Sequence, residues 1–228
     1  MSNKKLAERQ QPRFFDLEPI TFENRSEIES QILDAARRGF VKYGSSRMSV
    51  RDIADLAGVS RGSVYKYFDD RDSLTSAVLG IAVECLIEDM DQAMIRFSTI
   101  DDQVVAAVLI VQSWRKAERD AQLFALSYEA TLLTTQESVR FLGPMVSLME
   151  RYLVEACERG EVRLDLNVSS AAEWIIRIVV SLSEIPGYTF NDDRPDETRQ
   201  FIQNHLLNGL GERYQSQSKS KSRMSKAR

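Results

Sequence analysis

The pentapeptide GVSRG, at residues 58–62, carries the first chemistry that the sequence suggests. It fits G-x-S-x-G, the pattern of the nucleophile elbow that presents a catalytic serine in α/β-hydrolases. In those enzymes an acidic residue and then a histidine follow the serine along the chain. The one histidine of this sequence, His205, follows Ser60 with several aspartates in between. The pattern raises the hypothesis of a serine hydrolase whose nucleophile is Ser60.

The residues before the pentapeptide argue against a hydrolase. An elbow serine follows a buried parallel strand. In VRDIADLA, the apolar residues from Val50 to Ala57 recur at spacings of three and four, which indicates one face of a helix. The order of serine, aspartate and histidine adds little, because almost any chain supplies an aspartate in between. The hydrolase is therefore kept only as the alternative from a different functional class.

Two short helices joined by a tight turn fit the same residues better. SVRDIADLAG predicts a helix capped by Ser49, with Asp52 in the N3 position of a capping box and Gly58 at its end. SRGSVYKYF predicts a second helix capped by Ser60. This arrangement is a helix-turn-helix, in which Ala54 keeps the first helix thin at the crossing. The apolar positions that would pack the helices together are Ile53, Ala57, Val59, Val64 and Tyr67.

Charge is distributed unevenly along the chain. Residues 36–74 carry eight basic and five acidic side chains, whereas residues 75–211 carry eleven and twenty-one. Residues 212–228 carry six basic side chains and one acidic one. A cationic segment joined to a larger anionic one suggests a polyanionic partner for the first segment only.

Helical periodicity continues through nearly the whole chain and predicts an all-α fold of about nine helices. Besides the two short helices, we expect helices near 26–44, 71–97, 102–118, 120–133, 136–159, 168–185 and 196–209. The only weak strand candidate is 161–168. We expect a mobile arm at 1–25 and a three-helix helix-turn-helix domain at 26–74. A long helix joins this domain to a helical ligand-binding and dimerisation domain at 75–211, and a basic disordered tail follows at 212–228.

Composition and spacing also exclude several classes of protein. No apolar run approaches the roughly 20 residues that span a bilayer, and the N-terminus lacks the apolar block of a signal peptide, so we expect a cytoplasmic protein. Cys85 and Cys157 lie in apolar helical patterns and are predicted to be buried free thiols rather than a disulfide or metal pair. The sequence has no cluster at metal-ligand spacing and no glycine-rich phosphate loop. We therefore expect no enzyme activity, no cofactor and no metal.

The segment ILDAARRGFVKYGSSRMSVRDIADLAGVSRGSVYKYFDDRDSLTSAVL, residues 32–79, resembles the DNA-binding domain of TetR-type transcriptional regulators. The family usually has Thr where Ser49 stands and Lys where Arg71 stands, and both replacements keep the chemistry. Met48 and Ser63 replace common threonines. The resemblance implies a homodimeric repressor that binds a pseudo-palindromic operator and is released by a small, largely apolar molecule. The alternative within the family is an activator without a small-molecule ligand.

The resemblance and the helix pattern together predict the DNA contacts. Arg61 is the candidate for base reading, because a guanidinium can bond guanine with two hydrogen bonds. Gly62 would let the backbone approach the groove closely. The arm cations Lys4, Lys5, Arg9 and Arg13, and those of the tail, could add non-specific phosphate affinity, but the favoured interpretation is that they are disordered solubility tails. The predicted phosphate contacts, which position the helix without reading sequence, are Tyr65, Lys66, Tyr67, Ser49 and Arg71. The predicted DNA-binding set is Ser49, Arg51, Ser60, Arg61, Gly62, Ser63, Tyr65, Lys66, Tyr67 and Arg71.

The larger region yields two further sets of candidates. By resemblance it encloses a ligand pocket, whose candidate lining is Met94, Trp114, Phe124, Tyr128, Glu129, Phe141, Met145, Trp174 and Arg177, although the apolar members fit a plain core equally well. Arg177 would pair with an acid across the dimer or reach water, or else anchor an anionic ligand group. By resemblance the last two helices form the dimer interface, with candidates Ile175, Ile178, Val179, Leu182, Phe201, Ile202, His205 and Leu206.

Overall fold

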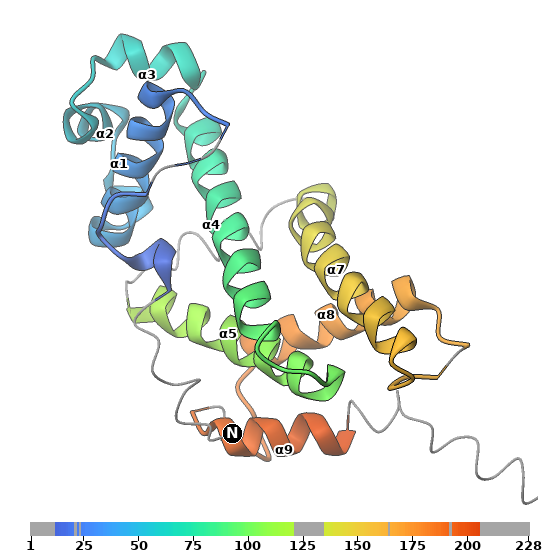
Figure 1. Ribbon diagram of the computed structural model, residues 1–228. Helices are drawn as coiled ribbons and strands as arrows, with labels where there is room; N and C mark the ends of the chain where they lie inside the picture. The colour runs from blue at the N-terminus through green and yellow to red at the C-terminus, as the bar shows by residue number, and fades with distance from the viewer. Residues whose placement is uncertain are drawn as a thin grey trace, which may run out of the picture. The chain divides into compact units, whose positions relative to one another are not determined.

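The computed structural model describes residues 12–20, 22, 24–120, 135–163, 165–191 and 193–205, with the side chains of 119–120, 135–141 and 184 left out. The described residues form eight α-helices and two short 3-10 helices and contain no strand (Figure 1). This confirms the all-α prediction. Residues 121–133 of the helix predicted at 120–133 lie outside the described residues. The described residues between 161 and 167 are bend, turn and irregular backbone, and a helix begins at Val168.

The chain divides into two compact units. Unit 1 is formed by Met1–Asp89 with Ser113–Gly143, and unit 2 by Met90–Gln112 with Pro144–Arg228. Three helices have residues in both units: α4 (Arg71–Met94), α5 (Ile100–Asp120) and α7 (Thr135–Glu158). Unit 1 therefore extends beyond the predicted 26–74 segment and includes the first part of α4 and the end of α5.

In unit 1, α1 (Glu27–Tyr43), α2 (Val50–Ala57) and α3 (Arg61–Tyr67) lie together beside the first turns of α4 (Figure 1). A short 3-10 helix, η3 (Ser45–Arg47), joins α1 to α2. Ser26 caps the N-terminus of α1, because its side chain accepts a hydrogen bond from Glu29 N, and Gly44, with φ 85°, caps its C-terminus. The core of this unit consists of fully buried side chains that include Ile32, Phe40, Ile53, Val64 and Leu74. Burial of each such side chain stabilises the fold by roughly 1.5–3 kcal/mol.

The segment before α1 differs from the prediction. The mobile arm predicted at 1–25 is wrong for residues 12–20 and 22, which we name the strap. The strap contains the 3-10 helix η2 (Arg13–Phe15), and four of its apolar side chains are buried. Their burial comes from contacts with distant parts of unit 1 rather than from a helical or strand period, which is why the sequence pattern did not reveal it. The buried side chains are Phe14, Phe15, Ile20 and Phe22.

Unit 2 contains parts of α4, α5 and α7 together with α8 (Val168–Glu184) and α9 (Pro195–His205). Asn167 caps the N-terminus of α8, because its side chain accepts a hydrogen bond from Ser170 N at 3.0 Å. Tyr152 Oη donates to Asp91 Oδ1 at 2.6 Å and so joins α7 to the end of α4. Among the described residues, no helix is both long enough and apolar enough to cross a membrane.

Candidate nucleic-acid interface

The turn between α2 and α3 decides how Ser60 is used. Gly58 adopts the left-handed conformation, with φ 68° and ψ 27°, a conformation that only glycine adopts without a steric penalty. Val59 N then donates to Ala54 O at 3.0 Å. Ser60 caps α3, because its Oγ accepts a hydrogen bond from Ser63 N at 3.0 Å. A helix and not a strand precedes Ser60, so the elbow reading is wrong and the capping prediction is confirmed.

α3 has one buried face and one face open to solvent. Val64 is buried on it, and Phe68, which ends the helix, is buried as well. Four predicted DNA-binding residues are exposed and two more are half-buried. The exposed residues are Arg61, Gly62, Tyr65 and Lys66, and the half-buried ones are Ser63 and Tyr67.

The exposed face of α3 combines cations with aromatic rings. The guanidinium of Arg61 lies 6.0 Å from the centre of the Tyr65 ring, and Lys66 Nζ lies 5.9 Å from the centre of the Tyr67 ring. At Gly62, an added Cβ would meet only Ser60 Oγ, at 3.6 Å. The backbone of the first turn of α3 is thus open to a close neighbour, and two flexible cations flank it.

The start of α2 is closed by its own capping box. Ser49 donates to Asp52 Oδ2 from its backbone N at 2.9 Å and from its Oγ at 2.6 Å, and its Oγ accepts from Asp52 N. These hydrogen bonds from Ser49 hold the pKa of Asp52 below its usual range. The donors of Ser49 are therefore engaged within the protein. Arg51 is exposed and lies 3.9 Å from Asp55 in a surface ion pair, a type that contributes little to stability.

Arg71 differs from its predicted use as a free phosphate contact. Its Nη2 donates to Ser45 O at 2.6 Å and its Nε donates to Met48 O at 3.2 Å. Both acceptors lie in the segment that leads into α2. Arg71 therefore positions this segment, a role that the sequence did not reveal, and phosphate contact by its remaining donors stays a prediction.

Sequence reasoning also missed exposed residues between α1 and α2. Lys42 and Tyr43 are exposed at the end of α1, with Lys42 Nζ 5.1 Å from the centre of the Tyr43 ring. Arg47 is exposed on η3. The cations of KYGSSR, directly before the predicted capping residue, were the available signal.

Comparison with known proteins supports the interpretation of α2 and α3 as a helix-turn-helix. Residues 32–78 match the family model described as bacterial regulatory proteins, tetR family. The HTH-type transcriptional regulator TtgR from Pseudomonas putida is 39% identical over 84 residues, which cover 37% of this chain and 38% of that protein. The chain thus spans well under two thirds of the length of this relative. Unit 1 carries a TetR-type helix-turn-helix domain.

Similarity beyond the TetR-type domain is weaker but longer. The HTH-type transcriptional activator FasR from Mycolicibacterium smegmatis is 27% identical over 176 residues, which cover 75% of this chain and 76% of FasR. Among solved structures, a transcriptional regulator of the TetR/AcrR family from Thermobifida fusca matches with a TM-score of 0.55 at 19% identity, over 81% of this chain and 98% of that one. The fold is therefore that of TetR-family regulators.

The predicted pocket residues do not form one group. Met94 and Met145 are buried in unit 2, whereas Trp114 is buried in unit 1, where it contacts the strap. Trp174 is 46% exposed on α8, so its placement in an internal pocket is wrong. Phe124, Tyr128 and Glu129 lie outside the described residues, as does the side chain of Phe141.

Arg177 is exposed and does not face the interior. Its Nε and Nη2 donate to Glu173 Oε1, one turn earlier on α8, at 2.9 and 2.6 Å. The acid lies on its own helix and not across a dimer, whereas the exposed side chain fits the other expectation, that Arg177 reaches water. The alternative role, anchoring a ligand inside the bundle, is wrong for this reason. In the described part of the chain, no cluster of His, Cys, Asp and Glu could hold a metal ion.

The predicted dimer residues separate into buried and accessible ones. Ile175, Val179 and Ile202 are fully buried within the single chain, so their assignment to a partner surface is wrong. These residues lie on the inner faces of α8 and α9, which the almost uniformly apolar sequence could not distinguish from the outer faces. The half-buried candidates are Ile178, Leu182 and Phe201, His205 is exposed, and Leu206 lies outside the described residues.

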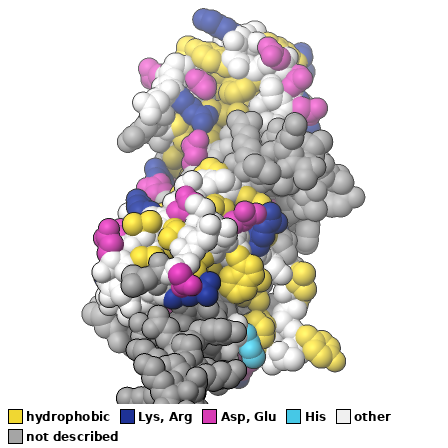
Figure 2. All heavy atoms as spheres, turned by 90° about the vertical axis from the view of Figure 1, so that its right-hand side faces the viewer, with side chains coloured by type: hydrophobic (Ala, Val, Ile, Leu, Met, Phe, Trp, Pro, Cys, Tyr) yellow, Lys and Arg dark blue, Asp and Glu magenta, His cyan; other side chains and the backbone are white. Residues whose placement is uncertain are grey.

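The accessible part of α9 is aromatic. The ring of Phe201 stacks on that of Phe190, with centroids 4.5 Å apart, and contacts the ring of His205 at 5.0 Å. Figure 2 shows hydrophobic side chains at the surface beside the one histidine. On α8 and just after it, Trp174, Ile185 and Tyr188 are exposed.

Proposed function

We propose that this chain is a TetR-type transcriptional regulator that binds a pseudo-palindromic operator as a homodimer and acts without catalysis. The observation that carries the proposal is the exposed face of α3, which presents Arg61 and Lys66 on a helix that Ser60 caps. In a helix-turn-helix the second helix enters the major groove, and residues near its N-terminus contact base edges.

The residues of α3 divide by the contact that they would make. Arg61, at the first position of the helix, reads a base, since its planar guanidinium matches the two acceptors of guanine. Gly62 lets the backbone approach the groove. Lys66 and Tyr65, one turn later, contact phosphates, which fix the register but carry no sequence information.

Dimerisation would place two copies of α3 in successive major grooves. Its support is the exposure of three large apolar side chains on α8 and just after it, Trp174, Ile185 and Tyr188, because exposed apolar surface marks association sites. A two-fold dimer requires half-sites about one helical turn apart. The dimer would have one conformation in which the spacing of the two α3 helices fits the operator and one in which it does not. A small molecule that binds the second conformation better would shift the population away from the DNA-binding form. Such a regulator acts in the cytoplasm, where the DNA is.

The direction of regulation has two candidates. The family resemblance favours a repressor that a largely apolar effector releases. The curated relative FasR, which matches over three quarters of its length, is named an activator, and this supports activation as the second candidate. Reporter transcription from the selected operator, with and without the chain, distinguishes the two.

Binding to duplexes selected from a random library tests the proposal. We expect the full chain to enrich a pseudo-palindrome, and Arg61→Ala to relax preference at one base pair per half-site by roughly 1–3 kcal/mol. Arg163→Ala, an exposed arginine of unit 2, is the matched control and should leave the preference unchanged. A chain that enriches no sequence, or an Arg61→Ala variant with unaltered preference, would contradict this assignment of α3.

The hydrolase alternative is tested by one further variant. Ser60→Ala should leave any background ester turnover unchanged and weaken operator binding, because α3 loses its cap. Loss of ester turnover in Ser60→Ala would restore the catalytic reading.

A further inference from the structure

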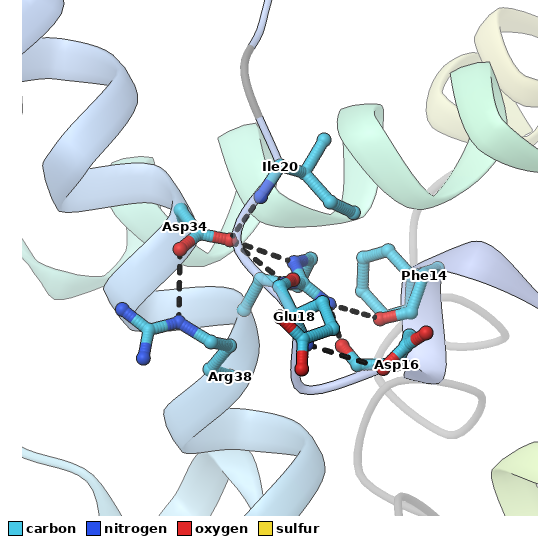
Figure 3. Close-up of polar contacts among 7 residues, drawn as sticks. Phe14, Asp16, Glu18, Ile20, Asp34 and Arg38 are labelled. Carbon is cyan, nitrogen blue, oxygen red and sulfur yellow. Dashed lines mark hydrogen bonds and ion pairs between the residues drawn. The ribbon is translucent and has the colours of Figure 1, made fainter.

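Arg37 of α1 is fully buried and bonds to three carbonyl groups of the strap. Its Nη1 donates to Phe14 O at 2.7 Å and also to Asp16 O, and its Nη2 donates to Glu18 O at 2.7 Å. Figure 3 shows these residues converging on α1 from one side. The guanidinium thus donates hydrogen bonds to the carbonyl oxygens of every second residue along this part of the strap.

Asp34 completes this anchor from the previous turn of α1. Its Oδ1 accepts from Arg37 Nη2 at 2.8 Å and from the backbone N of Ile20 at 3.1 Å, and its Oδ2 accepts from Arg38 Nε at 2.8 Å (Figure 3). A buried ion pair is stable only when further hydrogen bonds satisfy its remaining donors and acceptors. Here the strap backbone supplies those bonds, so the pair and the strap depend on each other.

The strap also contacts α4 and the end of α5. The rings of Phe14 and Phe15 contact Trp114 of α5, with centroids 5.8 and 5.1 Å apart. Trp114 Nε1 donates to Asp89 Oδ2 of α4 at 2.9 Å. Arg13 Nη1 lies 3.3 Å from Glu88 Oε2, also on α4. The side chain of Arg13 therefore forms an ion pair with α4.

Cys85 lies one turn before Glu88 and Asp89 on α4, and it is buried. Burial raises the pKa of its thiol to about 11, against the opposing charges of Arg13 and Arg37. The ion pair of Arg13 with Glu88, one turn further along α4, places the strap near Cys85. The accessibility of Cys85 is therefore a local reporter of whether the strap is closed.

From these contacts we propose that the strap is a positioning element for DNA binding: it locks α1 to α4 and α5 within unit 1 and thereby sets operator affinity. The inference rests on the proposed function. α1 supports both α2 and α3, since all three helices pack together. When the strap is open, α1 has more orientations, and binding to DNA must remove this added freedom at a cost in affinity.

The test uses the full chain with Cys157→Ser, so that Cys85 is the one remaining cysteine. Phe14→Ala/Phe15→Ala removes the aromatic anchors and leaves Arg37 and Asp34 intact. Leu17→Ala, a strap residue that is 49% exposed, is the matched control. Two quantities are compared between these variants: the rate at which an aromatic disulfide reagent modifies Cys85, and the affinity for the best duplex selected by the full chain.

We expect Phe14→Ala/Phe15→Ala to raise the rate of Cys85 modification about tenfold, because local opening exposes the thiol. Operator affinity should fall about tenfold. The Leu17→Ala control should stay within about twofold of the parent in both measurements. Arg37→Lys keeps the charge beside Asp34 but loses the planar fork that reaches the three carbonyl groups, and it should change both quantities in the same direction. This second variant serves where the double variant fails to give the parent's far-ultraviolet circular dichroism.

Two results would overturn the strap's role. One is a reactive Cys85 in Phe14→Ala/Phe15→Ala with the operator affinity of the Leu17→Ala control, which would mean that the strap opens without consequence for DNA. The other is a Cys85 that reacts no faster than in the parent in either Phe14→Ala/Phe15→Ala or Arg37→Lys. If the parent chain enriches no duplex, DNA binding itself is wrong and the coupling falls with it, while the Cys85 rates still report separately on strap closure.

Discussion

The guanidinium of Arg71 donates a hydrogen bond to the carbonyl oxygen of Ser45, 26 positions earlier in the chain, at 2.6 Å. Arg71 is the first residue of α4, and Ser45 is the first residue of η3. A second bond, from Nε to Met48 O, holds the other end of the same short segment. The start of α4 thus fixes the backbone that delivers Ser49 to the N-cap of α2.

Replacement of Arg71 should therefore act on stability before it acts on DNA. Arg71→Ala should lower the free energy of unfolding by roughly 1.5–3 kcal/mol, as expected for lost hydrogen bonds from a charged donor. Urea unfolding followed by circular dichroism measures this loss. Arg47→Ala, an exposed cation of the same segment, is the control and should change stability by less than about 0.5 kcal/mol. Equal effects of the two variants would argue against the positioning role.

Lys66→Ala should weaken all duplexes alike. A phosphate contact adds affinity without sequence preference, and its loss lowers the slope of log affinity against log salt by about one. Titrations of selected and scrambled duplexes at several salt concentrations measure both effects. A loss confined to the selected duplex would make Lys66 a base-reading residue.

Two glycines of unit 1 should respond to alanine with opposite signs. Gly58 has φ 68°, so Gly58→Ala should destabilise the domain by roughly 1–2 kcal/mol. Gly80 lies inside α4, and an added Cβ there would meet nothing within 4 Å, so Gly80→Ala should stabilise it by roughly 0.5–1 kcal/mol. Thermal or urea unfolding of the two variants decides, and a stabilising Gly58→Ala would be incompatible with the left-handed turn.

Cys85 should make stability depend on pH in the alkaline range. Its pKa is raised by burial to about 11 in the folded chain, so the folded state holds this proton more tightly than the unfolded state. The resulting stabilisation is fully present below the pKa of the unfolded thiol and is lost as pH rises toward about 11. Unfolding of the parent and of Cys85→Ala at about pH 8 and pH 10.5 isolates this effect from other groups. The parent should lose more stability than Cys85→Ala, and parallel losses would contradict burial of the thiol.

Association should depend on the outer face of α8. Trp174→Glu should raise the monomer fraction in sedimentation experiments, because it places a charge in the apolar surface proposed to meet a second copy. Ile95→Glu is the control, since Ile95 is an exposed apolar residue of unit 2 outside α8. An unchanged monomer fraction in Trp174→Glu would move the dimer interface elsewhere.

The sequence predicted what local chemistry determines. The caps at Ser26, Ser49 and Ser60, the left-handed Gly58 and the inward side of α3 all follow from residue type and spacing within a few positions. Each capping residue forms hydrogen bonds with backbone groups at the end of its own helix, so the prediction did not depend on contacts with distant parts of the chain.

Contacts between distant segments could not be predicted in this way. Arg37 follows an aspartate at helical spacing and reads as one more surface charge, yet it is fully buried because the strap backbone surrounds it. On α8, Trp174 and Ile175 are neighbours of similar hydrophobicity, and only the packing of unit 2 determines that the first is exposed and the second is not. Periodicity therefore identified the helices but not the partners of their faces.

The strap has a consequence for the order in which the chain folds. The contacts among α1, α2 and α3 join residues close in sequence, so this part can form early, as a short stretch of chain leaves the ribosome. The contact of Phe14 with Trp114 cannot form until α5 has been synthesised. A nascent chain would thus complete α3 before the aromatic contacts of the strap can form, and full closure of the strap would have to wait for the synthesis of α5.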